Sequence, residues 1–379
     1  MVAVVGIGRA MHSPAGRAPA ATSGPVVAGP PISSYVAAGQ VPPYYVSILS
    51  RDGTYYPYYA VVKATVSGKT LATIQPSVAR SSILAVTAAA DGQVFVLEEQ
   101  RFGDSQPFDT RTFYEFRLSS SGRPGPLTRL PMTVPNGQLL TGMALSPDGS
   151  KLAITVEPDN NKKEPNLTTV SVYTLTTGAA RTWTANGTIG DGADDARSLS
   201  WTADGRTLAF DWEDAPPGAR VGVWLLDIGA RGTNLMADSR QAVSLRPQSY
   251  PGEPSAAVVP RPTCLQQDSV IIPDGSMVVC GAIASVDPKL THRDLERGAV
   301  TEFREYSVAT GKVVRILGDW KFTSVGSLAV NVLWSNASGS VLIGVIPDAG
   351  FGRAGVIRGN TFTPLPGLAV TAGALAGTW

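Results

Sequence analysis

The feature that most constrains the fold is a repeated pattern of two apolar runs joined by a short turn that contains Gly. Five copies recur along the chain of 379 residues. Their turns are Asp91-Gly92, Asp148-Gly149, Asp204-Gly205, Asp274-Gly275 and Ser338-Gly339. Asp-Gly readily adopts the positive φ of a tight hairpin turn, and the flanking runs are rich in Val, Ile, Leu and Phe. Each copy therefore predicts a β-hairpin.

A second motif follows each hairpin, namely an alternating strand that ends in a turn with Gly and is followed by one more short strand. The copies are residues 170–178, 221–229 and 303–311, with looser copies at 61–68 and 113–122. The unit is thus four antiparallel strands. Four-stranded sheets that repeat every 40 to 50 residues or more are typical of β-propeller blades. The alternative is a β-sandwich, which has similar turns but lacks a recurring four-strand period.

The two ends of the chain predict the number of blades. Five complete units begin near residues 83, 140, 197, 265 and 328, whereas residues 44–74 supply only three strands. The small apolar residues of 367–379 would provide the missing innermost strand, which closes the ring and leaves no exposed inner edge. We therefore predict an all-β, six-bladed propeller of four-stranded antiparallel blades over residues 41–379, with seven blades as the alternative. Residues 1–40, rich in Ala, Pro and Gly, are predicted to be a flexible tether.

Composition excludes several classes of function. The chain has 31 basic and 30 acidic residues, whereas a nucleic-acid-binding protein needs a basic stripe. Two His and two Cys leave little for a zinc site or a His-based triad, and no cofactor is predicted. No window of 18 apolar residues predicts a membrane span. The apolar run at residues 2–7 is shorter than a signal-peptide core of about 7 to 15 residues.

The repeats resemble a known group of proteins. Ala144-Leu-Ser-Pro-Asp-Gly-Ser-Lys-Leu-Ala-Ile154 and Leu199-Ser-Trp-Thr-Ala-Asp-Gly-Arg-Thr-Leu-Ala-Phe210 are similar to the repeats of TolB-like and WD-repeat-like bacterial propellers. The Trp-Asp dipeptide of true WD repeats is absent from the strand ends, where Leu226-Asp227 is the nearest equivalent. The resemblance extends over residues 41–379. It implies a propeller fold and a binding or scaffolding role.

The loops of one face are the candidate site. We label the strands of a blade a to d from the axis outward, so that the a–b and c–d turns lie on one face and the b–c connections on the other. The predicted b–c connections are residues 101–111, 157–166, 211–220, 285–299 and 347–353. Aromatic and Arg side chains on such loops tend to anchor interfaces. The candidate partner-binding residues are Phe102, Phe108, Trp212, His292, Arg293, Phe351 and Arg353.

This pattern favours a non-catalytic module, expected to be a monomer, that binds a protein or a small-molecule or glycan ligand on the long-loop face. A polar loop that is merely solvated is the plainer interpretation of any single residue. The alternative function is a propeller hydrolase, lactonase-like or glycan-acting, which would use carboxylates near the axis and a divalent cation.

Three further candidates carry less weight. The acidic run at residues 191–195 offers oxygen ligands for Ca²⁺, but its spacing does not match an EF-hand loop, so an acidic turn is favoured. His292 has charged neighbours and is expected to be solvated. Cys264 and Cys280 flank one hairpin, and either a disulfide or two buried thiols would suit them. A disulfide would indicate an oxidising, extracytoplasmic location, which the sequence otherwise leaves open.

Overall fold

The structure is a computed structural model, and all of its regular elements within the described residues are β-strands. It describes residues 41–50, 58–101, 110–134, 138–158, 167–186, 195–213, 221–245, 269–285, 299–321, 331–336, 338–348 and 351–370. The predicted tether, residues 1–40, lies outside these ranges. The strands form six antiparallel sheets, and the order of strands within each sheet follows the chain.

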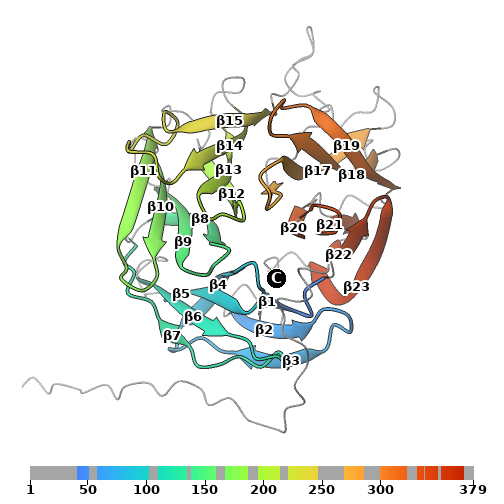
Figure 1. Ribbon diagram of the computed structural model, residues 1–379. Coiled ribbons are helices and arrows are strands. Elements are labelled where there is room, and N and C mark those ends of the chain that lie inside the picture. Colours follow the sequence, from blue (N-terminus) through green and yellow to red (C-terminus); the bar gives the residue numbers. More distant parts are fainter. Residues whose placement is uncertain are drawn as a thin grey trace, which may run out of the picture.

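The six sheets are the blades of a β-propeller, arranged around a central axis with the first strand of each sheet nearest to it (Figure 1). Blade 1 contains β1 (Tyr44–Ser50), β2 (Tyr58–Ala64) and β3 (Thr70–Ile74), and blade 2 contains β4 (Ser81–Ala88), β5 (Val94–Arg101), β6 (Thr110–Arg117) and β7 (Thr128–Arg129). Blade 3 contains β8 (Gln138–Leu145), β9 (Lys151–Pro158), β10 (Leu167–Thr174) and β11 (Ala180–Asn186). Blade 4 contains β12 (Asp195–Trp201), β13 (Thr207–Glu213), β14 (Gly222–Asp227) and β15 (Ser239–Ser244). Blade 5 contains β16 (Val270–Ile271), β17 (Met277–Ser285), β18 (Ala299–Ser307) and β19 (Val313–Lys321), and blade 6 contains β20 (Asn331–Ser335), β21 (Leu342–Asp348), β22 (Phe351–Arg358) and β23 (Thr361–Val370).

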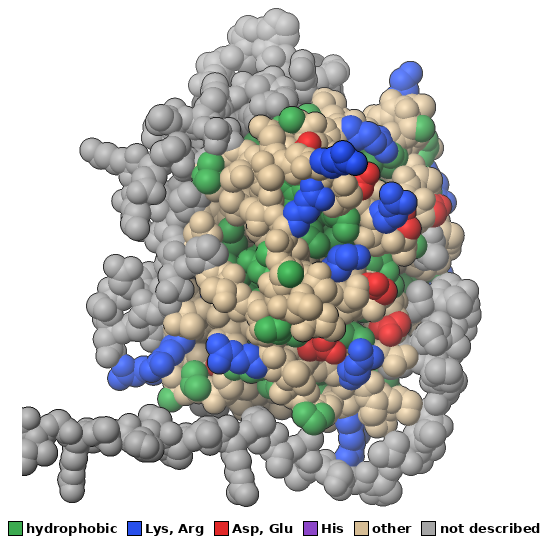
Figure 2. Space-filling view, turned by 60° about the vertical axis from the view of Figure 1, so that its left-hand side comes forward, with side chains coloured by type: hydrophobic (Ala, Val, Ile, Leu, Met, Phe, Trp, Pro, Cys, Tyr) green, Lys and Arg blue, Asp and Glu red, His purple; other side chains and the backbone are tan. Residues whose placement is uncertain are grey.

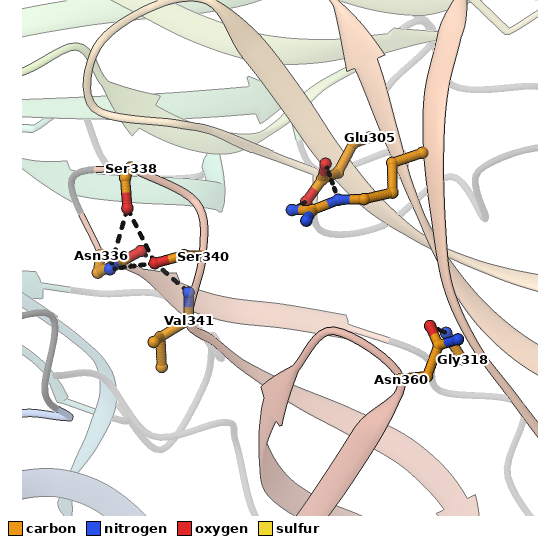
Figure 3. Close-up of polar contacts among 8 residues, drawn as sticks. Glu305, Gly318, Asn336, Ser338, Ser340, Val341 and Asn360 are labelled. Atoms are coloured by element: carbon orange, nitrogen blue, oxygen red, sulfur yellow. Dashed lines mark hydrogen bonds and ion pairs between the residues drawn. The ribbon is translucent and has the colours of Figure 1, made fainter.

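The five predicted hairpin turns are confirmed. The Gly residues at positions 92, 149, 205, 275 and 339 all have positive φ, between 62° and 76°. In the second turn, Gly149 N–H donates to the Ser146 carbonyl, and the Asp148 carboxylate accepts a hydrogen bond from Ser150 N–H at 3.0 Å. Blade 6 lacks the Asp, and Asn336 replaces it by accepting from Val341 N–H and donating to Ser338 and Ser340 (Figure 3). In each of blades 2 to 6, a side chain therefore accepts a backbone hydrogen bond that fixes the a–b turn.

The c–d turns agree with the second motif except in blade 4. Gly68, Gly178 and Gly311 have positive φ, whereas Gly229 is not among the glycines with positive φ. Between β14 and β15 the chain instead packs on the outer strand of blade 3, where Thr184 N–H donates to Thr233 and Leu235 N–H donates to Thr184. Leu235 is fully buried there. This connection adds packing between two blades at the periphery of the ring.

The hydrophobic core is divided into six clusters, and each cluster lies between two neighbouring blades. The cluster between blades 3 and 4 contains Trp183, Phe210 and Trp212. The cluster between blades 1 and 6 contains Tyr45 together with Val341 and Ile343. Each blade thus packs on two others, which is the arrangement of a closed ring and differs from the two stacked sheets of a sandwich.

The predicted closing strand is only partly placed. Residues 367–370 belong to β23, the outermost strand of blade 6, because Val370 pairs with Gly352 and Ala369 pairs with Arg353. The prediction that they begin the innermost strand of blade 1 is therefore wrong. Residues 371–379 lie outside the described residues, and blade 1 shows three strands.

Candidate functional site

The two faces of the ring differ in the length of their connections. On one face the a–b strands are joined by the short Gly turns described above. On the other face, four pairs of strands are joined by long connections, which are residues 102–109 between β5 and β6, 159–166 between β9 and β10, 214–221 between β13 and β14, and 286–298 between β17 and β18. Apart from Val221, these connections lie outside the described residues, and so do the predicted residues Phe102, Phe108, His292 and Arg293. Four of the five predicted long connections therefore leave the sheets on the same face.

The prediction that residues 347–353 form a fifth long connection is wrong. Strands β21 and β22 pair as far as Asp348 and Phe351, so only residues 349–350 separate them. Phe351 and Arg353 are strand residues of β22. Arg353 is exposed, and its guanidinium lies 5.7 Å from the centroid of the Phe362 ring on β23. The two residues thus belong to the sheet of blade 6 and not to a long loop.

Trp212 also lies in a strand, and the prediction that it belongs to a loop is wrong. It is part of β13, and its side chain is 2% exposed. The charged residues near it suggested a loop, but successive side chains of a strand point to opposite sides. Asp211 contacts blade 5, whereas Trp212 packs against blade 3 in the cluster that contains Trp183. Trp212 supports the ring and is not available to a partner.

The remaining candidates are only partly described. Cys280 is buried and disulfide-bonded, while Cys264, which we expect to be its partner, lies outside the described residues. Of the acidic run, residues 191–194 also lie outside, and Asp195 begins β12. Within the described ranges, no three His, Cys, Asp or Glu side chains are grouped so that they could hold a metal ion.

A buried polar cluster lies beneath the long-loop face between blades 2 and 3. Arg111 Nε is 3.1 Å from Glu98 Oε1, and Arg111 also donates to the Gln138 carbonyl. Burial raises the pKa of Glu98 to about 7, although the charge of Arg111 opposes the shift. Arg111 Nη1 and Gln138 Oε1 have no hydrogen-bond partner among the described residues. The cluster joins β5 and β6, the two strands that residues 102–109 connect, to the start of β8 in the next blade.

Two similar contacts join the next blades along the ring. The Asp211 carboxylate accepts hydrogen bonds from the backbone and the hydroxyl of Ser269 in blade 5. Thr141 donates to Thr155 at 3.0 Å and, in the alternative orientation of its hydroxyl, to the Ala196 carbonyl at 2.9 Å. The sequence analysis missed these residues. A signal was present at Thr155, a polar residue within the apolar run of β9, whereas Glu98 begins the polar end of β5, residues 98–101, and does not stand out there.

A cavity of about 450 Å³ lies on the axis, lined by the inner strands of blades 2 to 6 and by the a–b turns of blades 2 to 5. Its described lining residues are all uncharged, and include the apolar side chains of Met143, Leu199 and Leu333 together with the hydroxyls of Ser200 and Ser335. The carboxylates that a propeller hydrolase would place near the axis are therefore not among the described residues of this wall.

The outer surface carries both signs of charge. On the side shown in Figure 2, Lys and Arg side chains lie close to Asp and Glu side chains. One exposed example is Arg117, whose Nε lies 3.6 Å from Glu115 Oε1. On blade 5, Arg315 forms a two-pronged ion pair with Glu305, and Glu305 is labelled in Figure 3. These pairs agree with the net charge of +1.

Comparison with solved structures gives the same architecture. TolB from Acinetobacter baumannii superposes with a TM-score of 0.51 and 15% identity, over 89% of this chain and 66% of that one, slightly less than two thirds of its length. The chain has a TolB-like propeller fold. A structure from Agrobacterium tumefaciens assigned as TolB has a TM-score of 0.43 and 14% identity over 85% of this chain and 87% of that one. An oligogalacturonate lyase from Vibrio parahaemolyticus has a TM-score of 0.42 and 10% identity over 76% and 70%.

At these identities the similarity to TolB establishes the fold alone. No protein-family model and no curated protein matches the sequence. Among the described residues there is no helix long and apolar enough to cross a lipid bilayer.

Proposed function

We propose that this TolB-like propeller is a non-catalytic binding module whose long b–c connections bind a protein partner. The observation that carries the proposal is the asymmetry of the two faces. The a–b turns are short, whereas the b and c strands of four blades are joined by residues 102–109, 159–166, 214–221 and 286–298. Loops held by a rigid scaffold are where binding residues tend to lie.

The polar contacts beneath this face support the proposal. Asp211 and Ser269 join blades 4 and 5, and Glu98 and Arg111 lie where blade 2 meets blade 3. Each pair is close to the point where a long connection leaves its strand. Buried hydrogen-bonded side chains limit the movement of the strand ends, so the points from which the loops depart are held in fixed relative positions. A rigid arrangement lowers the entropy cost of binding.

The alternative, a propeller hydrolase, is less well supported. It requires carboxylates near the axis and a divalent cation, and the described lining residues of the axial cavity are uncharged. Metal analysis of the purified protein distinguishes the two functions. A stoichiometric divalent cation that remains after dialysis would favour the hydrolase.

The experiment compares a loop variant with three substitutions and a control variant with two substitutions in a partner-capture assay. The loop variant changes Phe102, Phe108 and Arg293 to Ala, and these positions are the predicted anchors that lie outside the described residues. The control variant changes Val66 and Arg206 to Ala on the opposite face, where Val66 is 84% exposed. Tagged protein is cross-linked in cells of the source organism, and the captured protein is then tested as a purified partner.

We expect the loop variant to bind that purified partner at least about tenfold more weakly than wild type, because aromatic and Arg anchors dominate interfaces. The control variant should bind like wild type. Equal affinity of all three proteins, each with an unchanged melting temperature, would contradict the use of this face.

A further inference from the structure

The axial cavity extends to the face opposite the long loops. Its rim includes Ala90, Pro147, Ala203 and Pro273, which occupy the same position in four a–b turns, directly before the Asp of each turn. The turns of blades 4 and 5 are tied together here, since Ala203 N–H donates to the Pro273 carbonyl at 2.6 Å. The entrance is therefore framed by short, hydrogen-bonded turns.

The wall of the cavity is largely apolar. Met143, Leu199, Leu333 and Trp334 line it, and each is only partly buried by the cores between the blades. They come from blades 3, 4 and 6, so the apolar surface surrounds the cavity on several sides. Water gains few hydrogen bonds at such a wall, whereas an apolar ligand would remove it from water at a gain of about 25 cal/mol per Å².

The hydroxyl groups of the wall are engaged within the protein or buried. Ser200 accepts from Ile271 N–H at 3.0 Å, and Thr141 has partners in blades 3 and 4. The Ser335 hydroxyl has no hydrogen-bond partner among the described residues, but its oxygen is buried and does not face the cavity. The apolar side chains therefore dominate what the wall offers to a ligand.

The electrostatics of the cavity and its rim disfavour an anion. The lining residues that the structure describes are uncharged, and burying a charge without a partner is costly. The Asp residues next to the rim positions add negative charge at the entrance. Asp148 is the clearest example, since hydrogen bonds from Ser146 and Ser150 lower its pKa to about 2 and keep it ionised at neutral pH.

We propose that the axial cavity binds an uncharged, mainly apolar small molecule, which enters through the rim of a–b turns. The volume of about 450 Å³ is within the range of small-ligand sites, roughly 300 to 1,000 Å³. This site is separate from the long-loop face, so it extends the proposed function and does not depend on it.

The experiment uses a pair of fluorescent probes that differ by one charge. The full chain is titrated with N-phenyl-naphthylamine, which is neutral and has one N–H group, and with anilinonaphthalene sulfonate, its sulfonated analogue. Trp201 and Trp334 line the cavity, so energy transfer from tryptophan reports whether the probe is bound nearby. We expect one saturable site for the neutral probe and an affinity about tenfold lower for the anionic probe.

Two substitutions fill the cavity from different blades, and one control adds the same bulk elsewhere. Leu199→Trp and Leu333→Trp occupy the cavity, and each is expected to weaken binding of the neutral probe about tenfold or more. The second variant keeps the test decisive if the first does not fold. Val314→Trp lies on the exposed outer strand of blade 5, where Val314 is 56% exposed, and should leave the affinity unchanged.

Three outcomes would overturn the proposal. They are the absence of saturable binding by the wild-type chain, unchanged affinity in a folded cavity variant, and equal affinity for the two probes. The loop variant used to test the proposed function should bind the neutral probe like wild type, so the two proposals fail independently.

Discussion

Arg111 and Glu98 form an ion pair in which both side chains are almost wholly buried, with 7% and 2% of their surfaces exposed. The two residues lie between blades 2 and 3, next to Gln138 at the start of β8. Burial raises the pKa of Glu98 to about 7, so the pair does not gain the full benefit of its charges at neutral pH.

The stability of the protein should therefore depend on pH through Glu98. The folded chain binds the Glu98 proton more tightly than the unfolded chain, so this contribution is largest below the unfolded pKa and is lost as pH rises through about 7. We expect the free energy of unfolding to fall by roughly 3 kcal/mol from this source between pH 5 and pH 8. Urea unfolding of wild type and Glu98→Gln at four pH values measures it.

The Glu98→Gln variant should show a flatter dependence on pH than wild type over this interval. Glu115→Gln is the matched control, because Glu115 pairs with Arg117 on the surface. It should keep the wild-type slope. Identical slopes for wild type and Glu98→Gln would show that another group is responsible.

Gly178 should be far less tolerant of substitution than Gly359. Both have positive φ, 71° and 55°, but a Cβ at Gly178 would lie 1.8 Å from the Pro131 carbonyl oxygen, whereas nothing lies within 4 Å of one at Gly359. Gly359→Ala is expected to cost about 1 kcal/mol for the backbone alone. Gly178→Ala should cost at least about 2 kcal/mol more, because the backbone of two segments must move apart. Chemical denaturation of both variants compares them, and equal losses would disprove the contact.

Trp212 should matter for stability. Its side chain fills the cluster between blades 3 and 4 with Trp183 and Phe210. Trp212→Ala is expected to lower the free energy of unfolding by about 3 to 5 kcal/mol, and Trp212→Phe by less, since a smaller cavity remains. Unfolding in urea gives both values. A Trp212→Ala chain as stable as wild type would mean that this cluster does not hold the two blades together.

Deletion of residues 371–379 tests the predicted closure of the ring. If these residues supply the inner strand of blade 1, their loss exposes the edge of β1 and lowers the melting temperature by several degrees. Deletion of residues 1–30 within the predicted tether is the control and should leave the melting temperature unchanged. A tail deletion that melts like wild type would contradict the closure.

Local chemistry explains why the turns were predictable from sequence. Asp148 and Gly149 determine their hairpin almost alone, since the carboxylate accepts hydrogen bonds within the turn and Gly supplies the positive φ. The four-strand repeat then follows from the spacing of such turns. Gly229 is the exception, because contacts of Leu235 with blade 3 decide the path of that connection.

The candidate site was less predictable because it depends on contacts between blades. Asp211 and Trp212 were interpreted as loop residues on account of their polar neighbours, but the strand extends far enough for each to meet a different blade. Phe351 was assigned to the predicted connection of residues 347–353, yet β21 and β22 pair as far as Asp348 and Phe351, so only two residues separate the strands. The axial cavity could not be predicted, since its wall combines side chains from five blades.

The packing of Tyr45 against Val341 and Ile343 has a consequence for the order of folding. Tyr45 emerges from the ribosome well before the two residues that cover it, so one flank of the first blade has no neighbour throughout most of translation. The nascent chain therefore carries an uncovered apolar flank until the sixth blade has been synthesised, and a stalled or shortened chain would be prone to self-association.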